Sequence, residues 1–205
     1  MDSLAVFSSR YAGSIDYYAA MCRYGRVAVD LTEHYDKRNK SLNRVCIVGP
    51  NGEQSLSVPL CKPNRDMKVR QIAISEHANW RHTHWGALFS AYGRTPFFEY
   101  FADDLKAIFE NKEIQTVAEF NLKLHEAIVE FLDLPIETIV IRDKAELANM
   151  EIKADFRDAN RDALADFRIE KEYYQIWSEK LGFCPNLSIL DLLSNLGREA
   201  VYFLR

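Results

Sequence analysis

Residues 79–85 read NWRHTHW, a run in which two histidines lie between two tryptophans. On a helix, His82 and His84 point about 200° apart, so they cannot hold one metal ion together. His77 and His84 share a helical face, but two turns, roughly 10.5 Å, separate them. Paired zinc ligands on a helix are four residues apart, and a zinc–nitrogen bond is only about 2.1 Å long. We therefore expect no metal site in this run.

Helical spacing gives the same run two faces with different chemistry. Trp80 and His84 share one face, and Arg81 shares the neighbouring stripe with Trp85 and Tyr92. Arg81 and Trp85 are expected to form a cation–π contact of about 0.5–1 kcal/mol. The tryptophans are expected to be core rings rather than ligand platforms, because buried aromatics are more frequent. His84 is a candidate general base, since its ordinary pKa is about 6.5, and with Arg81 it suits an anionic or sugar-like ligand.

A second group of candidate residues lies in segment 33–44, after a valine-rich run that ends at Asp30. The segment has four cations, two acids, a tyrosine and two asparagines: Lys37, Arg38, Lys40, Arg44, Glu33, Asp36, Tyr35, Asn39 and Asn43. A solvated turn is the ordinary explanation. The alternative is a site for phosphate or pyrophosphate beside Asp30, because α/β proteins gather ligand groups at the carboxyl ends of their strands.

Several standard catalytic patterns are absent from the sequence. It contains neither GxGxxG nor a Walker lysine motif, which excludes the usual dinucleotide and P-loop sites. It contains no GxSxG and no Cys–His pair suited to nucleophilic catalysis. The net charge of −4 and the pI of about 5.8 argue against a nucleic-acid partner, which would need a basic face. The sequence identifies no cofactor.

Apolar periodicity predicts the elements that must position these residues. In the first part we expect strands, one helix and a hairpin around Gly-Pro-Asn-Gly: a strand at Leu4–Phe7, a helix at 15–24 closed by Gly25, a strand at 26–31, the hairpin at 44–60 and a further strand at 67–74. The fold class is therefore α/β or α+β. The strand–helix–strand opening and the hairpin are expected to form one mixed sheet.

The second half of the chain is expected to be rich in helices. They are predicted at 79–92 with an N-cap at Ser75, at 97–110, at 117–134, and after 170 with breaks at Cys184-Pro185 and Gly197, while 137–142 is predicted as a strand. Residues 143–170 are charged and weakly periodic, so a long surface connection is expected there. We expect one domain over 1–205, strand-rich over 1–74 and helix-rich over 75–205.

The sequence also bears on location and partners. The first residues lack the apolar run and the flanks of a signal peptide, and no stretch approaches the roughly 20 apolar residues that span a bilayer. The four cysteines form no CxxC pair and lie in apolar surroundings, which favours free thiols in a reducing compartment. We expect a cytoplasmic protein without membrane insertion. Oligomerisation is left open.

Five stretches, in the same order, resemble the WbqC-like family across essentially the whole chain. They are SIDYYAAM, VAVDLTEHYDKRNKSLNR, LSVPL, NWRHTHWGALFSAYGRTPFFEYF and YYQIWSEKLGFCPNLSILDLL. The closing LSILDLL is particularly similar to members from the Bacteroides group of bacteria. The resemblance implies a place in O-antigen or other surface-polysaccharide biosynthesis. For some members, transfer of glycine or a similar acyl group to an amino sugar has been suggested.

The resemblance also implies which positions carry the function. The family's motif residues fall on Tyr35, Lys37, Asn43, Arg44, Trp80, Arg81, His84, Trp85, Tyr92 and Gly93, and its late aspartate falls on Asp191. An ordinary role for that aspartate is a buried helix cap or an ion-pair partner. The chain departs from the family in its first loop, where members often carry prolines in a pattern like YxPxxYY. Ala12 and Gly13 stand there instead, which predicts a more flexible loop.

Three hypotheses for the function follow. The leading one is a transferase acting on a nucleotide-linked or phosphorylated sugar, an anionic small molecule, with these residues at work: His84 and Asp30 in catalysis, and Tyr35, Lys37, Asn43, Arg44, Trp80, Arg81, Trp85 and Tyr92 in substrate binding. The second is a non-catalytic binding or scaffold protein of the same pathway, favoured by the absence of a recognisable nucleophile. The third is nucleotidyl or adenylyl transfer, which lacks its HxGH-type motif.

Overall fold

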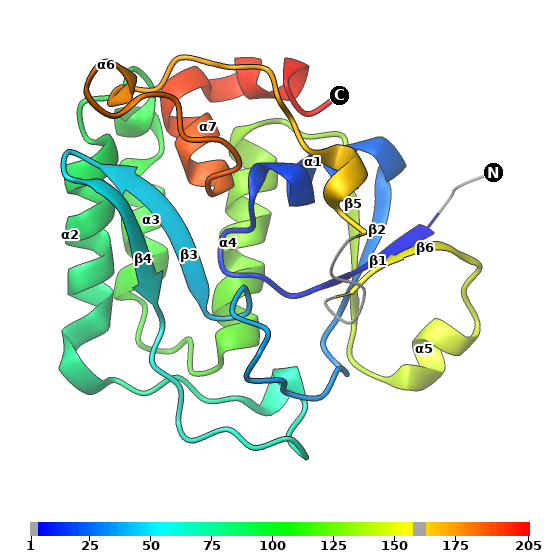
Figure 1. Ribbon diagram of the computed structural model, residues 1–205. Coiled ribbons are helices and arrows are strands. Elements are labelled where there is room, and N and C mark those ends of the chain that lie inside the picture. The colour runs from blue at the N-terminus through cyan, green and yellow to red at the C-terminus, as the bar shows by residue number, and fades with distance from the viewer. Residues whose placement is uncertain (1–3, 158–162) are drawn as a thin grey trace.

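The computed structural model describes residues 4–157 and 163–205, and its centre is a four-stranded parallel sheet (Figure 1). The strand order is β5-β2-β1-β6, with β1 at Leu4–Ser8, β2 at Arg26–Asp30, β5 at Glu137–Ile141 and β6 at Ile152–Phe156. The two central strands are short apolar runs and are almost wholly buried, as parallel strands covered on both faces should be. Because the strands are parallel, their carboxyl ends lie along one edge.

The strand–helix–strand opening is confirmed. Helix α1 (Ile15–Tyr24) follows β1 and ends at Gly25, whose φ of +71° is one that side-chain-bearing residues rarely adopt. The helix buries the rings of Tyr17 and Tyr18 in the core. It returns the chain to β2, which pairs with β1 over its full length.

The connection expected over 143–170 instead contains a helix and the fourth strand of the sheet. Helix α5 (Lys144–Ala148) precedes β6, and β6 pairs in parallel with β1 on the side away from β2. Ile152, Ala154 and Phe156 alternate with polar residues, a strand pattern that the charged surroundings hide. Residues 158–162, also within that stretch, lie outside the described residues.

The hairpin forms at the expected place but makes its own sheet. Strands β3 (Arg44–Gly49) and β4 (Gly52–Ser57) pair with each other in a two-stranded antiparallel sheet, separate from the parallel one. The strand expected over 67–74 is not formed. A short 3-10 turn occupies Val69–Gln71, and the chain then meets its neighbours only one residue at a time, at Ala73 and Ile74. Single bridges of this kind cannot build a ladder.

Helices fill the second half, as expected, and pack around one continuous core. They are α2 (Trp80–Tyr92), α3 (Ala102–Glu110), α4 (Val117–Phe131), α6 (Ser178–Leu181) and α7 (Ile189–Leu196), with 3-10 turns at His77–Asn79, Phe98–Tyr100, Ala165–Phe167 and Gly197–Tyr202. Figure 1 shows the hairpin and α2 on one side of α4 and the parallel sheet on the other. Helix α2 begins at Trp80, later than the predicted N-cap Ser75, because Ala78 and Asn79 have positive φ.

The first loop, expected to be flexible, is tied to two other segments by three hydrogen bonds. Tyr11 N–H donates to the Ser41 carbonyl (3.0 Å), Ser188 Oγ donates to the Ala12 carbonyl (2.7 Å), and the N–H of residue 189 donates to Gly13 (2.9 Å). Tyr11 and Ala12 are 1% and 2% exposed, so the loop is part of the core. In the part of the chain that the structure describes, no helix is both long and apolar enough to cross a bilayer.

Candidate functional site

A cavity of about 1160 Å³ opens at the carboxyl edge of the parallel sheet. Its wall is built from the ends of β1, β2 and β6, the segment that follows β2, and the start of α5: Ser8, Ser9, Asp30, Thr32, Glu33, His34, Tyr35, Asp36, Arg38, Asn39, Lys40, Ser41, Leu42, Arg65, Val69, Lys144, Asp155 and Arg157. Since the chain leaves β1 towards β2 and later returns to the other side of β1, this edge holds the topological switch point of the sheet. Open α/β sheets bind their ligands at such points. We call it the sheet-edge cavity.

Asp30 is fixed at the end of β2 on the floor of the sheet-edge cavity. One carboxylate oxygen accepts hydrogen bonds from the Thr32 backbone N–H (2.8 Å) and the Thr32 hydroxyl (2.7 Å). The other accepts from Nη1 of Arg157 at 3.0 Å. With 1% of its surface exposed, Asp30 is a buried carboxylate whose charge is compensated by these donors.

Arg157 follows β6 and reaches back over the end of the sheet. Besides Asp30, its guanidinium contacts Asp155 through Nε at 2.9 Å and through Nη2. The hydrogen bond and charge of Arg157 hold the pKa of Asp155 below its usual range, and Asp155 in turn raises the pKa of Arg157. The guanidinium is therefore a permanent, fixed cation on the cavity wall.

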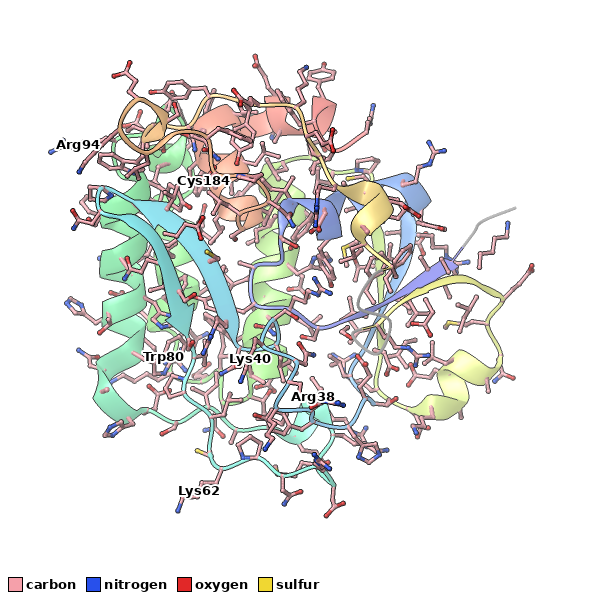
Figure 2. All side chains as sticks on the ribbon, viewed as in Figure 1. Arg38, Lys40, Lys62, Trp80, Arg94 and Cys184 are labelled. Atoms are coloured by element: carbon pink, nitrogen blue, oxygen red, sulfur yellow. The ribbon has the colours of Figure 1, made fainter. Side chains whose placement is uncertain are left out.

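The other cations of the cavity are arranged differently. Arg38 folds back on Asp36, with Nε donating to it at 2.8 Å, and this bond keeps the pKa of Asp36 well below its usual range. Lys40, Arg65 and Lys144 make no ion pair within residues 4–157 and 163–205. In Figure 2, Arg38 and Lys40 are labelled near the centre of the view, with Lys40 on the side nearer Trp80. The cavity thus has three cationic side chains available to a ligand.

The predicted residues of segment 33–44 divide between the cavity and other places. Tyr35 lines the cavity, half-buried against the core, and Lys37 is exposed outside its lining. Asn43 donates from Nδ2 to the Val58 carbonyl (2.7 Å), which holds the segment to the strand after the hairpin turn. Arg44 donates from Nε to the Ser57 hydroxyl (3.0 Å) and lines a separate cavity of about 100 Å³.

His84 lies in the core beneath the hairpin, outside the lining of the sheet-edge cavity. The Tyr11 hydroxyl is 3.0 Å from its Nδ1, the Tyr11 ring stacks on it, and the Trp80 ring meets it edge-on. Burial lowers the pKa of His84 to about 4, although a hydrogen bond to the backbone of Ser57 opposes the shift. His84 is therefore a neutral ring near pH 7 that joins the first loop to β4.

Arg81 also has its donors occupied inside the protein. Nε donates to Glu76 at 3.0 Å, Nη1 donates to the Asn111 carbonyl at 2.9 Å, and Nη2 donates to the Ile114 carbonyl at 2.8 Å. Its guanidinium carbon lies 4.8 Å from the centre of the Trp80 ring, so the cation–π partner is Trp80 rather than the predicted Trp85. Arg81 thus closes the end of α3. We call Tyr11, Trp80, Arg81 and His84 the hairpin core cluster.

The remaining predicted aromatics are packed in the same core. Trp85 stacks on Phe98 with ring centres 5.8 Å apart. Tyr92 is fully buried, and its pKa is raised by burial and by the neighbouring charge of Asp191. Asp191, in the first turn of α7, accepts a hydrogen bond from Gln175 Nε2 at 3.1 Å and another from the Tyr173 hydroxyl. Burial raises the pKa of Asp191 to about 6.

Residues that sequence reasoning missed supply most of the cavity's cations. Arg157 and Lys144 lie within residues 143–170, where a surface connection is expected, and Arg65 precedes the strand expected at 67–74. The alternation of Ile152, Ala154 and Phe156 was the available signal for β6, and a strand there would have placed Arg157 at a strand end. Among the described residues no cluster of three or more His, Cys, Asp or Glu side chains could hold a metal ion.

The comparisons with known proteins agree with the resemblance seen in the sequence. The family model of the WbqC-like protein family matches residues 9–155, from the end of β1 into β6. The uncharacterized protein Rv1507c of Mycobacterium tuberculosis is 27% identical over 232 aligned residues, which cover 100% of this chain and 98% of the relative. No solved structure matches the chain significantly. Because the model covers well over half of the sequence, the chain belongs to the WbqC-like protein family.

Proposed function

We propose that the sheet-edge cavity binds a phosphorylated or nucleotide-linked sugar and that the protein transfers a group to or from it. The observation that carries this proposal is the set of three cations, Lys40, Arg65 and Lys144, without ion-pair partners in the described part of the chain, at the carboxyl edge of a parallel sheet. Cations held near one another repel, so a site of this kind is stabilised by a multivalent anion. Phosphate and diphosphate groups fit that demand.

The rest of the cavity wall suits a sugar better than a bare polyanion. It carries five cationic side chains and four carboxylates, so its charge is mixed rather than uniformly basic. Carboxylates accept hydrogen bonds from sugar hydroxyls but repel a bare phosphate, and the hydroxyls of Ser9, Thr32 and Ser41 can bond to either group. Tyr35 offers a half-buried ring for contact with a sugar or a base.

The cavity also has room for a ligand of this size. Small-molecule sites in proteins measure about 300–1000 Å³. At about 1160 Å³, the sheet-edge cavity can hold a donor and an acceptor together, as group transfer requires. Of the two residues predicted for catalysis, Asp30 lines this cavity and His84 does not. The proposal therefore places the reaction beside Asp30.

The direct test is a thermal-shift and calorimetric screen of nucleotide sugars against the protein and two lysine variants. Lys40 lines the cavity and Lys37, three residues earlier in the same segment, does not. Lys40→Ala is expected to weaken the binding of a diphosphate sugar about tenfold, the usual effect of one charge-assisted contact, and Lys37→Ala to leave it unchanged. Equal effects of the two variants would contradict the assignment of the cavity.

A non-catalytic binding protein is the second candidate, and one observation favours it. Both oxygens of Asp30 already accept hydrogen bonds, and His84 lies outside the cavity, so neither of the two residues predicted for catalysis is poised to take a proton. Incubation with a nucleotide sugar, an amino sugar and glycyl or acetyl donors, followed by mass spectrometry, separates the two. A mass change in the sugar that Lys40→Ala slows supports the transferase. Binding with no product from any of these donors supports the second candidate.

A further inference from the structure

Arg157 is placed by two carboxylates that come from different strands. Asp30 ends β2 and Asp155 lies in β6, with β1 between these strands in the sheet. The guanidinium therefore spans the carboxyl end of β1, where Ser8 and Ser9 line the cavity. It is held by Nη1 on one side and by Nε and Nη2 on the other.

This arrangement leaves part of the guanidinium for a ligand. An arginine has five N–H donors in a rigid plane. Nη1 and Nη2 each carry two hydrogens, and the contacts with Asp30 and Asp155 occupy one on each nitrogen. The side chain is 32% exposed and lines the cavity. Within the part of the chain that the structure describes, the second hydrogen of each of these two nitrogens has no protein acceptor, and the side chain that carries them lines the cavity.

We propose that Arg157 is the directional anion-binding residue of this cavity, and that Asp30 and Asp155 are its positioning residues. The proposal rests on the proposed function, since it assigns the phosphate of the same ligand to a particular side chain. A guanidinium matches two phosphate oxygens with two parallel hydrogen bonds, which a lysine cannot do. In this arrangement Lys40, Arg65 and Lys144 attract the anionic ligand, and Arg157 orients its phosphate.

For one substitution, the change in anion affinity expected from this role is opposite to the change expected from charge alone. Removing a negative charge from the wall of an anion site should tighten anion binding. If Asp155 positions Arg157, however, Asp155→Asn must weaken anion binding, because the guanidinium loses its fixed direction. Asp36→Asn is the matched control, since Asp36 lines the same cavity but holds Arg38, whose side chain is 71% exposed. This control is expected to bind the anion equally well or more tightly.

The experiment measures the affinity of UDP-N-acetylglucosamine and of inorganic pyrophosphate by calorimetry, for the full chain and its variants. Arg157→Ala and Arg157→Lys should each weaken binding about tenfold or more, and Asp155→Asn and Asp30→Asn should weaken it in the same direction. Millimolar guanidinium ion should restore binding to Arg157→Ala but not to the double variant Arg157→Ala with Asp155→Asn. A merely structural role for Arg157 would give no such dependence on Asp155.

The possible outcomes separate this inference from the proposed function. If Lys40→Ala weakens binding while the Arg157 variants bind normally, the cavity is correct and the role of Arg157 is refuted. Tighter binding by Asp155→Asn would refute its positioning role. If neither probe binds the unaltered protein, both proposals fall. Thermal melting of each variant shows whether it is folded, and Asp155→Asn is the safer variant because that side chain is 44% exposed.

Discussion

The sheet-edge cavity and the hairpin core cluster are made from the same kinds of residue but differ in where their donors point. In the cluster, Nε, Nη1 and Nη2 of Arg81 all donate to a carboxylate or a carbonyl of the protein, and His84 bonds to Tyr11 and the backbone of Ser57. In the cavity, Lys40 and Lys144 have no ion-pair partner among the described residues.

The difference teaches that residue type alone does not mark a ligand site. Arginine, histidine and tryptophan occur in close spacing in the sequence, yet here the polar groups of Arg81 and His84 bond to Glu76, Tyr11 and neighbouring backbone. The buried Nε1–H of Trp80 has no hydrogen-bond partner among the described residues. A buried polar group that is satisfied internally stabilises the fold and has little left for a ligand. Four predictions follow from this contrast, beginning with the largest effect.

Arg81→Ala should be the most destabilising of these changes. It removes the donors to the buried carbonyls of Phe109 and Ile114, and unsatisfied buried groups cost about 1–3 kcal/mol each. We expect a loss of about 3 kcal/mol or more in the free energy of unfolding, measured by urea denaturation. The folded fraction should bind pyrophosphate with unchanged affinity. A stable variant with weakened binding would instead move Arg81 into the ligand site.

Acidification should destabilise the core through its histidines. Burial lowers the pKa of both His84 and His125 to about 4, below the ordinary value of about 6.5. The unfolded chain then binds more protons between these values, so stability is complete above about pH 6.5 and is lost as the pH falls towards 4. The loss approaches about 3 kcal/mol per histidine at the acid end.

This pH dependence can be separated from that of Asp191. The raised pKa of Asp191, about 6, acts in the opposite direction, because protonation of its buried carboxyl on the way to pH 4 favours the folded state. Urea denaturation at several pH values from 7 to 4.5 should show how the free energy of unfolding falls with pH. Relative to the unaltered protein, this fall should be shallower for His84→Gln and steeper for Asp191→Asn. The same slope for His84→Gln and the unaltered protein would mean that folding does not lower the pKa of His84.

Gly13→Ala should destabilise the first loop, which touches the hairpin core cluster through Tyr11. A Cβ at this position would lie 2.6 Å from Cδ1 of Tyr17, which no side chain tolerates. Overpacking of this size costs about 1–3 kcal/mol. The matched control is Gly86→Ala in α2, where a Cβ meets nothing within 4 Å. That helix substitution should stabilise the protein by about 0.5–1 kcal/mol in thermal melts.

Lys144→Ala should have the smallest effect on stability. Its side chain lies on the cavity wall and pairs with no acid in the described part of the chain, so the free energy of unfolding should change by no more than about 0.5 kcal/mol. Calorimetry with pyrophosphate should nevertheless show weaker binding and a smaller dependence on salt. Loss of stability together with unchanged pyrophosphate binding would contradict the distinction between the sheet-edge cavity and the hairpin core cluster.

Local patterns in the sequence were enough to predict the elements that form locally. The helix over 15–24, the hairpin around Pro50-Asn51 and the strand near 137–141 all depend on periodicity or turn residues within a short window. Asp30 and Tyr35 could be placed near a strand end for the same reason. The shared helical face of Trp80 and His84 also followed from spacing, and Trp80 is a core ring as expected, whereas the burial of His84 was not predicted.

Long-range pairing was beyond such patterns. Strand β6 exists because β1 offers it a partner far back in the chain, and two of its five residues, IKADF, are charged. The guanidinium of Arg157 and the carboxylate of Asp30 meet only after that pairing has formed. Likewise, nothing in the NWRHTHW run reveals that the donors of Arg81 point at the end of α3, because the accepting carbonyls belong to another helix.

The strand order has a consequence for the protein during synthesis. The edge of β1 that receives β6 is complete at residue 8, but β6 begins only at residue 152. At ordinary ribosomal speeds of roughly 5–20 residues per second, that edge stays without β6 for on the order of ten seconds. An open, apolar strand edge is a template for pairing with other chains. Until its last strand emerges, the growing chain therefore carries an edge of β1 that other chains can pair with.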